Sequence, residues 1–390
     1  MKILLVSLFL PEIRGTTAGG RFMGELLKEL SKVHEIYLAT RVEEIQMEKV
    51  EDIKRYCKKI YLFPYPEIQK RNWLTLMRII VSYLSFSYKV NQIVDSGNFD
   101  LVHVEWVEAG ILLKRKKVPM ILAAHDIITK PAERYFKKSR GIISLLLYMR
   151  FLLTRSLERY ILKKFDKVFV RSEHDRDYLL SMGMQINAGV LPSPIGLDFT
   201  GKKLEREENT IMFLGSYKNY SSNVESVLYF HNSIFPLIKS KIPSVKFYVV
   251  GYGPTKEMMD ILGQDKDAVI TGYVDDIESY YKKVKVFVAP MLTGGGVITK
   301  ILYAMLAGTP VVSTSIGNEG IGGIDNEHLL IADDPSEFAN KVVSLLSDEN
   351  LWLRLSNEGR VFVSGRFSMD TVRDELNRTY NEILIGRSRW

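Results

Sequence analysis

Residues 291–320, MLTGGGVITKILYAMLAGTPVVSTSIGNEG, join a glycine-rich loop to a helix and then to a strand. Gly308 and Pro310 predict where the helix ends, and the PVVST that follows is typical of a short buried strand. This order of elements indicates an α/β chain. The apolar residues after the glycines recur at i, i+3, i+4, i+7 and i+8, which is one face of a helix: Ile298, Ile301, Leu302, Met305 and Leu306.

The glycine loop and the helix start together predict a binding site for a phosphate or diphosphate. Gly294, Gly295 and Gly296 lack Cβ atoms, so backbone N–H groups can close on a ligand. A helix N-terminus presents unpaired N–H donors and the positive end of the helix dipole, and Lys300 adds a full charge within the first turn. The alternative is a tight loop that packs closely on a sheet.

The composition is that of a globular protein in a reducing compartment. The chain has 390 residues, 46% of them apolar and 25% charged, which suits two domains. Its one cysteine, Cys57, excludes an intrachain disulfide and favours the cytoplasm. The opening MKILLVSLFLPE is interpreted as a first strand rather than a signal sequence. Two further apolar stretches, 73–86 and 141–153, are too short to cross a bilayer, and we expect no transmembrane helix.

Positive charge is concentrated in the first half of the chain. Residues 1–200 contain 32 Lys and Arg against 22 Asp and Glu, whereas residues 201–390 contain 21 against 24. Residues 111–170 alone contain 15 against 4. With the apolar stretches 73–86 and 141–153, this predicts docking on an anionic membrane, as a peripheral protein on the inner face of the cell membrane. The alternative is that both stretches are core helices. No recognition motif predicts nucleic-acid binding.

Buried strands alternate with helices along the whole chain. A βαβ unit begins at residue 1, and NTIMFLG at residues 209–215 restarts the alternation after a polar segment. The predicted elements include helices at 224–239 and 256–262 and strands at 101–105, 268–272 and 284–289. We therefore predict an α/β fold of two Rossmann-like, doubly wound domains facing each other across a cleft. The predicted parts are a first domain at 1–195, a linker at 196–208, a second domain at 209–370, and a C-terminal helix at 371–390 that crosses back to the first domain.

The order and spacing of the motifs resemble those of GT-B fold glycosyltransferases, in particular the large retaining family four. Beside the glycine loop, Lys300 and GNEG, the matching segments run through nearly the whole chain: GG before a helix near the N-terminus, ILAAHD, LPSPIGLD, FLGSYKNYSSN, VVGYGP, ITGYVDDIESYY and HLLIADDPSEFA. The resemblance implies a hexosyl-type transferase that moves a sugar from a nucleotide diphosphate donor to a glycan or lipid-linked glycan, with retention of configuration.

The resemblance also implies roles for individual residues. The donor diphosphate would lie against Gly294–Gly296 and Lys300, with Gly215 and Lys218 on the opposite wall. His125 matches the histidine that faces the transferred sugar, and Arg21 would line the acceptor entrance. Lys218 could equally be a solvated loop lysine, Tyr273 could stack on the base or merely pack, and His125 could be structural. The full set for the donor is Gly19, Gly20, Gly215, Lys218, Tyr273, Gly294, Gly295, Gly296, Lys300, Tyr303 and Glu319.

The family has two glutamates that lie eight positions apart, and this sequence departs from the family at both positions. Here those positions hold Gly295 and Tyr303, so the acid expected to accept from the ribose hydroxyls is missing. Glu319 is the nearest acid along the chain that could face the same cavity. The alternatives are a changed donor, or a non-catalytic GT-B partner subunit in a glycan assembly pathway. A dinucleotide-dependent oxidoreductase is disfavoured because neither domain has the full G-x-G-x-x-G fingerprint.

No metal or cofactor is expected. The six histidines are scattered without paired ligand spacing, so helix N–H groups and lysine must meet the charge of a departing diphosphate. For retention, no pair of carboxylates can be assigned as nucleophile and acid. Departure and attack on the same face of the sugar is therefore the working mechanism.

Overall fold

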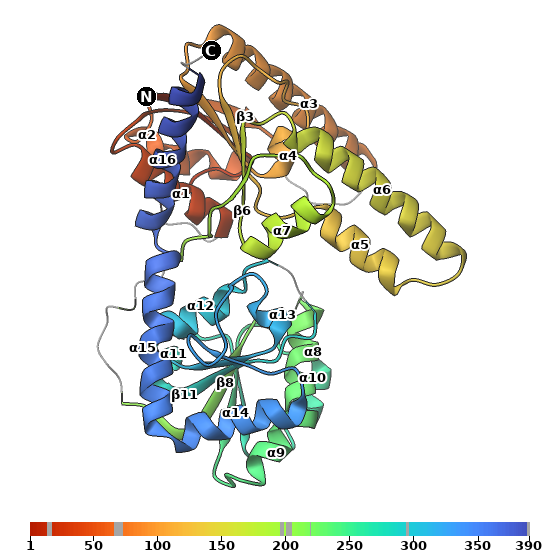
Figure 1. Cartoon of the computed structure of the whole chain (residues 1–390), viewed down its shortest axis with the longest axis vertical. Helices are drawn as coiled ribbons and strands as arrows, with labels where there is room; N and C mark the ends of the chain where they lie inside the picture. The colour runs from red at the N-terminus through yellow and green to blue at the C-terminus, as the bar shows by residue number, and fades with distance from the viewer. Residues whose placement is uncertain are drawn as a thin grey trace. The chain divides into compact units, whose positions relative to one another are not determined.

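The computed structural model describes residues 1–13, 18–65, 73–195, 199, 205–218, 220–293 and 296–387. Two compact units divide the chain (Figure 1). The first contains Met1–Gly196 together with Met369–Trp390, and the second contains Leu197–Ser368. The last helix of the chain therefore belongs to the first unit.

The first unit is built on a seven-stranded parallel sheet in the order β3-β2-β1-β4-β5-β6-β7. Central strands are buried on both faces, as expected of a sheet that helices cover on both sides. The strands are β1 (Lys2–Ser7), β2 (Glu35–Val42), β3 (Lys59–Pro64), β4 (Leu101–Glu105), β5 (Met120–Ala123), β6 (Lys167–Val170) and β7 (Ala188–Val190).

Two hydrophobic clusters cover the two faces of this sheet. One contains side chains of α3, α6 and α7, and the other contains side chains of α1, α2 and α16. Val372, Leu376 and Tyr380 of α16 are fully buried in the second cluster, which fixes the C-terminal helix on this unit. The helices are α1 (Ala18–Leu30), α2 (Val50–Lys54), α3 (Trp73–Ser96), α4 (Val107–Gly110), α5 (Thr129–Lys138), α6 (Ile142–Leu162), α7 (Glu173–Ser181) and α16 (Met369–Arg387).

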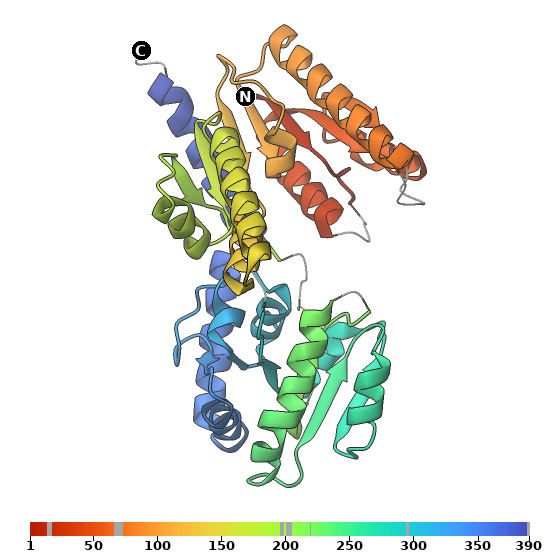
Figure 2. The same ribbon diagram turned by 90° about the vertical axis from the view of Figure 1, so that its right-hand side faces the viewer.

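The second unit is built on a six-stranded parallel sheet in the order β10-β9-β8-β11-β12-β13, with helices on both sides (Figure 2). Its strands are β8 (Glu207–Leu214), β9 (Lys246–Val250), β10 (Ala268–Gly272), β11 (Val284–Ala289), β12 (Val311–Ser313) and β13 (Leu330–Ile331). Its helices are α8 (Ser221–Tyr229), α9 (Phe235–Lys239), α10 (Lys256–Leu262), α11 (Ile277–Lys283), α12 (Thr299–Leu306), α13 (Ser315–Asn318), α14 (Pro335–Ser347) and α15 (Glu349–Arg366).

The two Rossmann-like α/β domains predicted from the sequence are confirmed. One helix differs in its interior: the segment predicted at 224–239 contains a π-helical turn, η2 (Phe230–Ile234), between α8 and α9. Pro236 lies just after this turn, at the start of α9. Because proline has no N–H and its ring clashes with the carbonyl four residues earlier, it interrupts the α-helical hydrogen bonding there.

The apolar stretches 73–86 and 141–153 both form helices, within α3 and α6 respectively. The first half of α6 is not a core helix, because nearly all its apolar side chains are exposed, up to 84% for Ile142. Among the described residues, no helix has the length and apolar character needed to span a membrane.

Candidate functional site

The residues predicted to bind the donor diphosphate gather at the carboxyl edge of the second sheet. Gly215 and Lys218 follow β8, Tyr273 follows β10, and the loop into α12 follows β11. These strands are parallel members of one sheet, so the segments that follow them lie at the same edge.

The predicted phosphate loop is described only in part. Gly294 and Gly295 lie outside the described residues. At Gly296 the backbone adopts φ +71°, a left-handed conformation that glycine reaches without strain. The helix α12 that follows runs from Thr299 to Leu306, and Gly308 lies just beyond its end with φ +72°, so the predicted glycine stop is confirmed.

Lys300 occupies the first turn of α12 and is turned inward. Its Nζ donates a hydrogen bond of 2.7 Å to Asn223 Oδ1 and lies 4.1 Å from the centroid of the Phe213 ring. Although the residue as a whole is only half-buried, burial lowers the pKa of its ammonium group to about 7. A nearby anion favours the protonated form of the lysine, so Lys300 would become fully charged when a diphosphate binds.

Asn223 was missed by sequence reasoning, although it belongs to the motif FLGSYKNYSSN. Its Nδ2 donates to Ser216 O at 2.8 Å while its Oδ1 accepts from Lys300. A Cβ atom at Gly215 would lie 2.9 Å from Asn223 Nδ2, so glycine is needed at this position. Gly251 is equally constrained, because its φ is +136° and a Cβ atom there would lie 1.7 Å from Gly215 O. The structure thus brings Gly215 and Lys300 together through one amide side chain.

Lys218 and Tyr273 lie on exposed loops at the same edge of the sheet. The Lys218 ammonium is 5.8 Å from the centroid of the Tyr252 ring, and the Tyr273 side chain is 69% exposed. Both positions are open enough to meet a ligand. Their roles in donor binding stay predictions.

Tyr303 occupies the position of the missing family acid, and Glu319 is the acid predicted to face the same cavity. The Tyr303 side chain is half-buried, with its ring centroid 6.5 Å from that of Tyr281. Glu319 is half-buried and directly precedes Gly320, which packs on the glycine loop: a Cβ atom at Gly320 would lie 2.1 Å from Gly296 O. The GNEG segment therefore contacts the predicted phosphate loop, as its place in the motif suggested.

His125 lies just after β5 in the first unit, in an aromatic and charged enclosure. Its ring stacks on Trp106 with centroids 4.1 Å apart and contacts Phe22 edge-on at 5.1 Å. Its Nε2 is 2.6 Å from Glu105 Oε2. Trp106 has a φ of 73°, a strained conformation for a residue with a side chain. Such strain is concentrated at functional sites, and here it holds the ring on which His125 rests.

Glu105 and Arg171 set the state of His125. Arg171 is buried, contacts His125 Nε2, and donates to Glu105 Oε2 at 3.2 Å. Burial and the Arg171 charge lower the pKa of His125 to about 4. Burial favours the neutral form of Glu105, but its contacts with His103 and His125 outweigh this and lower its pKa below the usual value. An ionised carboxylate only accepts hydrogen bonds and a guanidinium only donates them, so the proton on His125 Nε2 depends on which of the two it pairs with. Pairing with Glu105 makes Nε2 the donor and leaves Nδ1 as an acceptor.

The C-terminal helix reaches this cluster through a second histidine. Tyr380 of α16 is fully buried, and its hydroxyl is 2.5 Å from His103 Nδ1. Burial raises the pKa of Tyr380 far above its usual value, so the hydroxyl keeps its proton and donates. His103 Nε2 in turn lies 3.2 Å from Glu105 Oε1.

Tyr380→Phe should destabilise the chain, because it leaves His103 Nδ1 buried without a donor. The expected loss is ~1–3 kcal/mol, the cost of an unsatisfied buried polar atom. Urea unfolding followed by circular dichroism measures it. The matched control is Tyr160→Phe, whose ring is 64% exposed and whose change should stay within about 0.5 kcal/mol. Equal stability of the two variants would show that the Tyr380 hydroxyl makes no net contribution.

Gly19 and Gly20 differ from prediction in their local structure. The sequence placed both glycines in a loop, but α1 begins at Ala18, so they form part of its first turn. Gly19 packs closely on two aromatic rings, since a Cβ atom on it would lie 3.3 Å from the Phe9 ring and 3.5 Å from the Trp106 ring. Gly19 thereby supports the ring that stacks on His125. Arg21 is exposed on α1.

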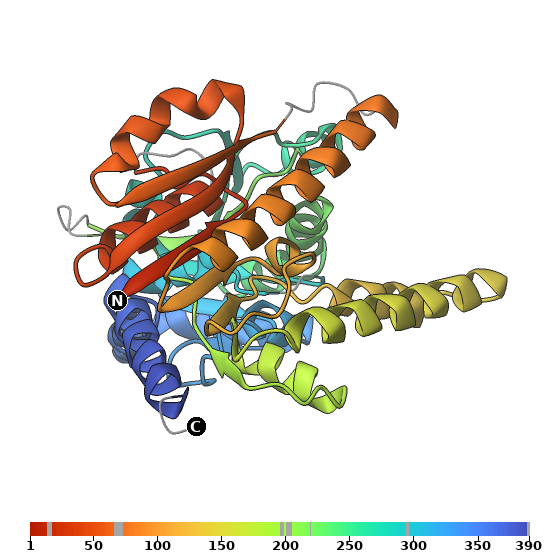
Figure 3. The ribbon, with the colours of Figure 1, turned by 90° about the horizontal axis from the view of Figure 1, so that it is seen from above.

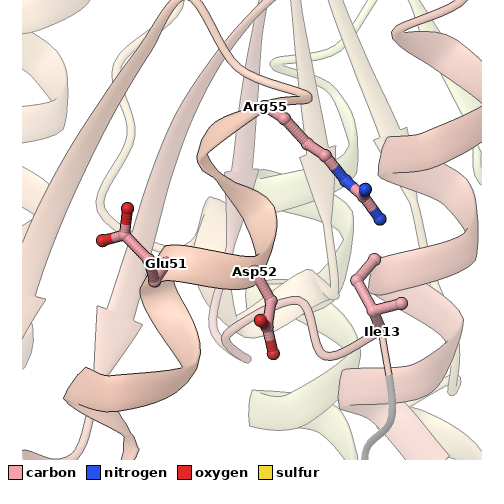
Figure 4. A pocket seen from close by; sticks show the side chains of 4 residues that line it. All are labelled: Ile13, Glu51, Asp52 and Arg55. Carbon is pink, nitrogen blue, oxygen red and sulfur yellow. The ribbon is translucent and has the colours of Figure 1, made fainter.

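The first unit also contains a cavity that is lined by none of these residues. Within the described ranges no three His, Cys, Asp or Glu side chains are grouped to hold a metal ion. A cavity of about 420 Å³ is lined by Ile13, Glu51, Asp52 and Arg55, where Glu51 points away from the arginine (Figure 4). Two acids beside one exposed arginine do not suit a diphosphate.

The sequence matches two family descriptions. Residues 19–199 match "Glycosyltransferase Family 4" and residues 208–348 match "Glycosyl transferases group 1". An uncharacterized 44.6 kDa protein in the cps region of Klebsiella pneumoniae is 24% identical, over 88% of this chain and 90% of that protein. The capsular polysaccharide biosynthesis glycosyltransferase CapM of Staphylococcus aureus is 29% identical, over 38% and 41%. A phosphatidyl-myo-inositol mannosyltransferase of Mycolicibacterium smegmatis is 24% identical, over 67% and 66%.

Solved structures share the fold over nearly the whole chain. Sucrose-phosphate synthase from Thermosynechococcus elongatus has a TM-score of 0.69 at 16% identity, covering 99% of both chains. Anabaena Alr3699/HepE in complex with UDP has a TM-score of 0.64 at 13% identity, covering 98% of this chain and 100% of that one. At these identities the likeness concerns the fold.

Proposed function

Because the chain belongs to the group 1 glycosyltransferases of the GT-B fold, we propose that it transfers a hexosyl group from a nucleotide diphosphate donor to a hydroxyl of a glycan or lipid-linked glycan. The observation that carries the proposal is Lys300, whose Nζ is held by Asn223 beside the glycine loop at the carboxyl edge of the second sheet. The HepE structure with UDP supports a uridine nucleotide as the first donor to test.

In this proposal each unit supplies one part of the chemistry. Lys300, the N–H groups at the start of α12 and the glycine loop stabilise the charge that develops on the departing diphosphate. His125 Nδ1 accepts a hydrogen bond from a hydroxyl of the transferred sugar and orients it. Glu105 is fully buried against His125 and Arg171, so it is not placed to attack the sugar. Retention by departure and attack on one face fits this arrangement.

The test combines ligand binding with turnover. Thermal shift against UDP-, GDP-, ADP- and TDP-linked sugars identifies the base, since a ligand at ~100 times its dissociation constant adds ~2.7 kcal/mol of stability. Transfer to an acceptor, or slow hydrolysis of the donor, is then measured with and without EDTA. We expect turnover that EDTA does not change. Failure of every nucleotide to stabilise the chain would contradict the proposal.

A non-catalytic partner subunit is the second candidate, and Tyr303 is the observation that favours it. The family acid at this position accepts from ribose, and a tyrosine cannot replace its charge. In a partner subunit the chain would keep the fold and the nucleotide edge but show neither transfer nor donor hydrolysis.

Tyr303→Glu decides whether the ribose position is still functional. We expect UDP affinity to rise about tenfold, because a carboxylate hydrogen bond to ribose is worth ~1.5–3 kcal/mol and part of it is lost in burying the charge. Isothermal titration with UDP measures the change, and Tyr303→Phe, which adds no acceptor, is the control. An unchanged affinity in a folded variant would remove this position from the donor site.

We also propose that the chain works at an anionic membrane surface, since the first half holds its excess of positive charge. Each Lys or Arg near such a surface contributes about 1 kcal/mol, and salt screens this attraction. Co-sedimentation with phosphatidylglycerol vesicles at low and high salt tests it. Absence of binding at low salt would contradict it.

A further inference from the structure

The helical hairpin formed by α5 and α6 exposes an apolar surface that no other described residue of the chain covers. Figures 1 and 3 show this hairpin extending away from the sheet of the first unit. Six side chains recur along α6 within an arc of about 80° on the helical wheel. All six are exposed, from 43% to 84%: Ile142, Leu146, Met149, Leu153, Leu157 and Tyr160.

The opposite side of α6 is the one that packs on α5. Phe151 is 9% exposed and its ring lies 6.3 Å from that of Phe136. The Tyr148 ring lies 5.0 Å from the same phenylalanine. The hairpin is therefore held together by one face of α6, while its exposed stripe makes no contribution to that packing. An apolar stripe left in water is unfavourable unless something else covers it.

The base of the hairpin is fixed to the segment that carries His125. Glu158 of α6 is buried and accepts hydrogen bonds from Ile128 N at 2.8 Å and from the Thr129 hydroxyl at 2.5 Å. These residues begin α5, three and four positions after His125. Lys130 and Asp175 add a buried ion pair of 2.5 Å between α5 and α7. The hairpin is thus a rigid extension of the loop that positions His125.

Positive charge surrounds the stripe. Residues 129–162 contain eight Lys or Arg and two Glu. Neither Glu lies in the stripe, since Glu158 is buried and Glu133 accepts from Tyr178 and pairs with Lys137. Arg140 precedes the exposed tip and Arg150 lies beside the stripe, and both are exposed. A second copy of the chain would bring the same positive excess and be repelled, whereas anionic lipid headgroups are complementary to it.

The tip is apolar over more than one face. Ile143 and Leu145 flank Ile142 and Leu146 on either side, and both are exposed by about two thirds, at 65% and 64%. A flat protein partner would cover one face of the tip and leave the other faces exposed to water, whereas the acyl region of a bilayer would surround the whole tip. The helix α3 lies on the same side of the first unit (Figures 1 and 3). Its exposed apolar residues include Met77, Val81, Leu84 and Tyr88.

We propose that the α5–α6 hairpin inserts its tip into the acyl region of an anionic bilayer, with Arg140 and Arg150 at the headgroup level. This inference rests on the proposed membrane association and names the element responsible for it. Because the hairpin base is fixed three residues from His125, insertion would hold that residue at a constant distance from a lipid-linked acceptor.

The depth of the tip can be measured directly. Cys57 is the only cysteine, so Leu146→Cys in a Cys57→Ser background accepts a single NBD fluorophore. Upon mixing with phosphatidylglycerol–phosphatidylcholine vesicles, we expect NBD emission to rise several-fold and resist quenching by dithionite. The matched label at Val361→Cys, an exposed apolar position of α15, should not respond. An unchanged signal at residue 146 would overturn the inference.

Binding variants separate the apolar from the electrostatic part. Ile142→Ser with Leu146→Ser should lower the vesicle partition coefficient at least tenfold, whereas Leu353→Ser with Val361→Ser on α15 should leave it unchanged. Arg140→Gln with Arg150→Gln should weaken binding at low salt and match the wild type at high salt. Equal binding of the serine hairpin variant, or a dimer that the same variant dissolves in sedimentation velocity, would overturn the inference. UDP binding of every variant is measured separately, so a failed donor assay cannot be mistaken for failed docking.

Discussion

Lys300→Met is expected to lower kcat/KM for the nucleotide-sugar about 100-fold to 1000-fold, or ~3–4 kcal/mol of transition-state stabilisation. The ammonium group is the full charge that the second unit places beside the glycine loop, and methionine keeps the volume without the charge. Donor binding, measured by titration with UDP, should weaken in parallel. Lys246→Met at the amino end of β9, on the opposite edge of the sheet, is the matched control.

Stability should change in the direction opposite to activity. The pKa of Lys300 is lowered in the folded state to about 7, so its charged form is disfavoured there and costs stability at and below neutral pH. This cost fades as pH rises from about 7 towards the unfolded value of ~10.4. The methionine variant should therefore unfold at a higher temperature than wild type at pH 6 to 7. A variant that lost both stability and binding would instead indicate a packing role for Lys300.

Donor affinity should also depend on pH through this lysine. If only the charged form binds the diphosphate, affinity falls about tenfold from pH 6 to pH 8, as the ammonium group with a pKa of about 7 loses its proton. A UDP-sugar is the suitable probe because its diphosphate does not titrate in this range. The Lys300→Met variant should bind weakly and without pH dependence. The same slope in both proteins would assign the titration to another group.

The sequence predicted the elements whose signals are local. β10, β11 and α10 lie at their predicted bounds, and α12 ends at Leu306, just before the predicted glycine stop at Gly308, because hydrophobic periodicity and glycine stops act within a few residues. The start of α1 was wrong by a few residues. There Gly19 packs closely against Phe9 and Trp106, which a local pattern does not reveal.

The polar partners could not be predicted because folding brings them from distant positions. Asn223 contacts Lys300, which is 77 residues away in the sequence, and Tyr380 contacts His103, which is 277 residues away. His125 was identified, but its partner Glu105 was seen only as the end of a buried strand. The exposure of α6 was left open by the sequence, since a basic apolar helix fits either a core or a surface until its packed face is known.

His125→Ala is expected to lower kcat at least 100-fold while UDP affinity stays within about twofold. The reason is the division of labour proposed above, in which the second unit holds the nucleotide and His125 Nδ1 accepts from the sugar. His125→Asn, whose Oδ1 matches the position of Nδ1, should recover part of the loss, and His125→Gln should not. His174→Ala changes an exposed histidine of the same unit and is the control.

The pH profile distinguishes this role from a structural one. His125 is neutral above its lowered pKa of about 4, so kcat should stay level as pH falls through the ordinary histidine range. Activity should then be lost as pH falls through about 4, where protonation removes the Nδ1 acceptor. A decline centred near the ordinary histidine value of ~6.5 would mean that Arg171 and burial do not keep His125 neutral. In that case Nδ1 would carry a proton during catalysis, and His125 would donate a hydrogen bond to the sugar or to the leaving oxygen instead.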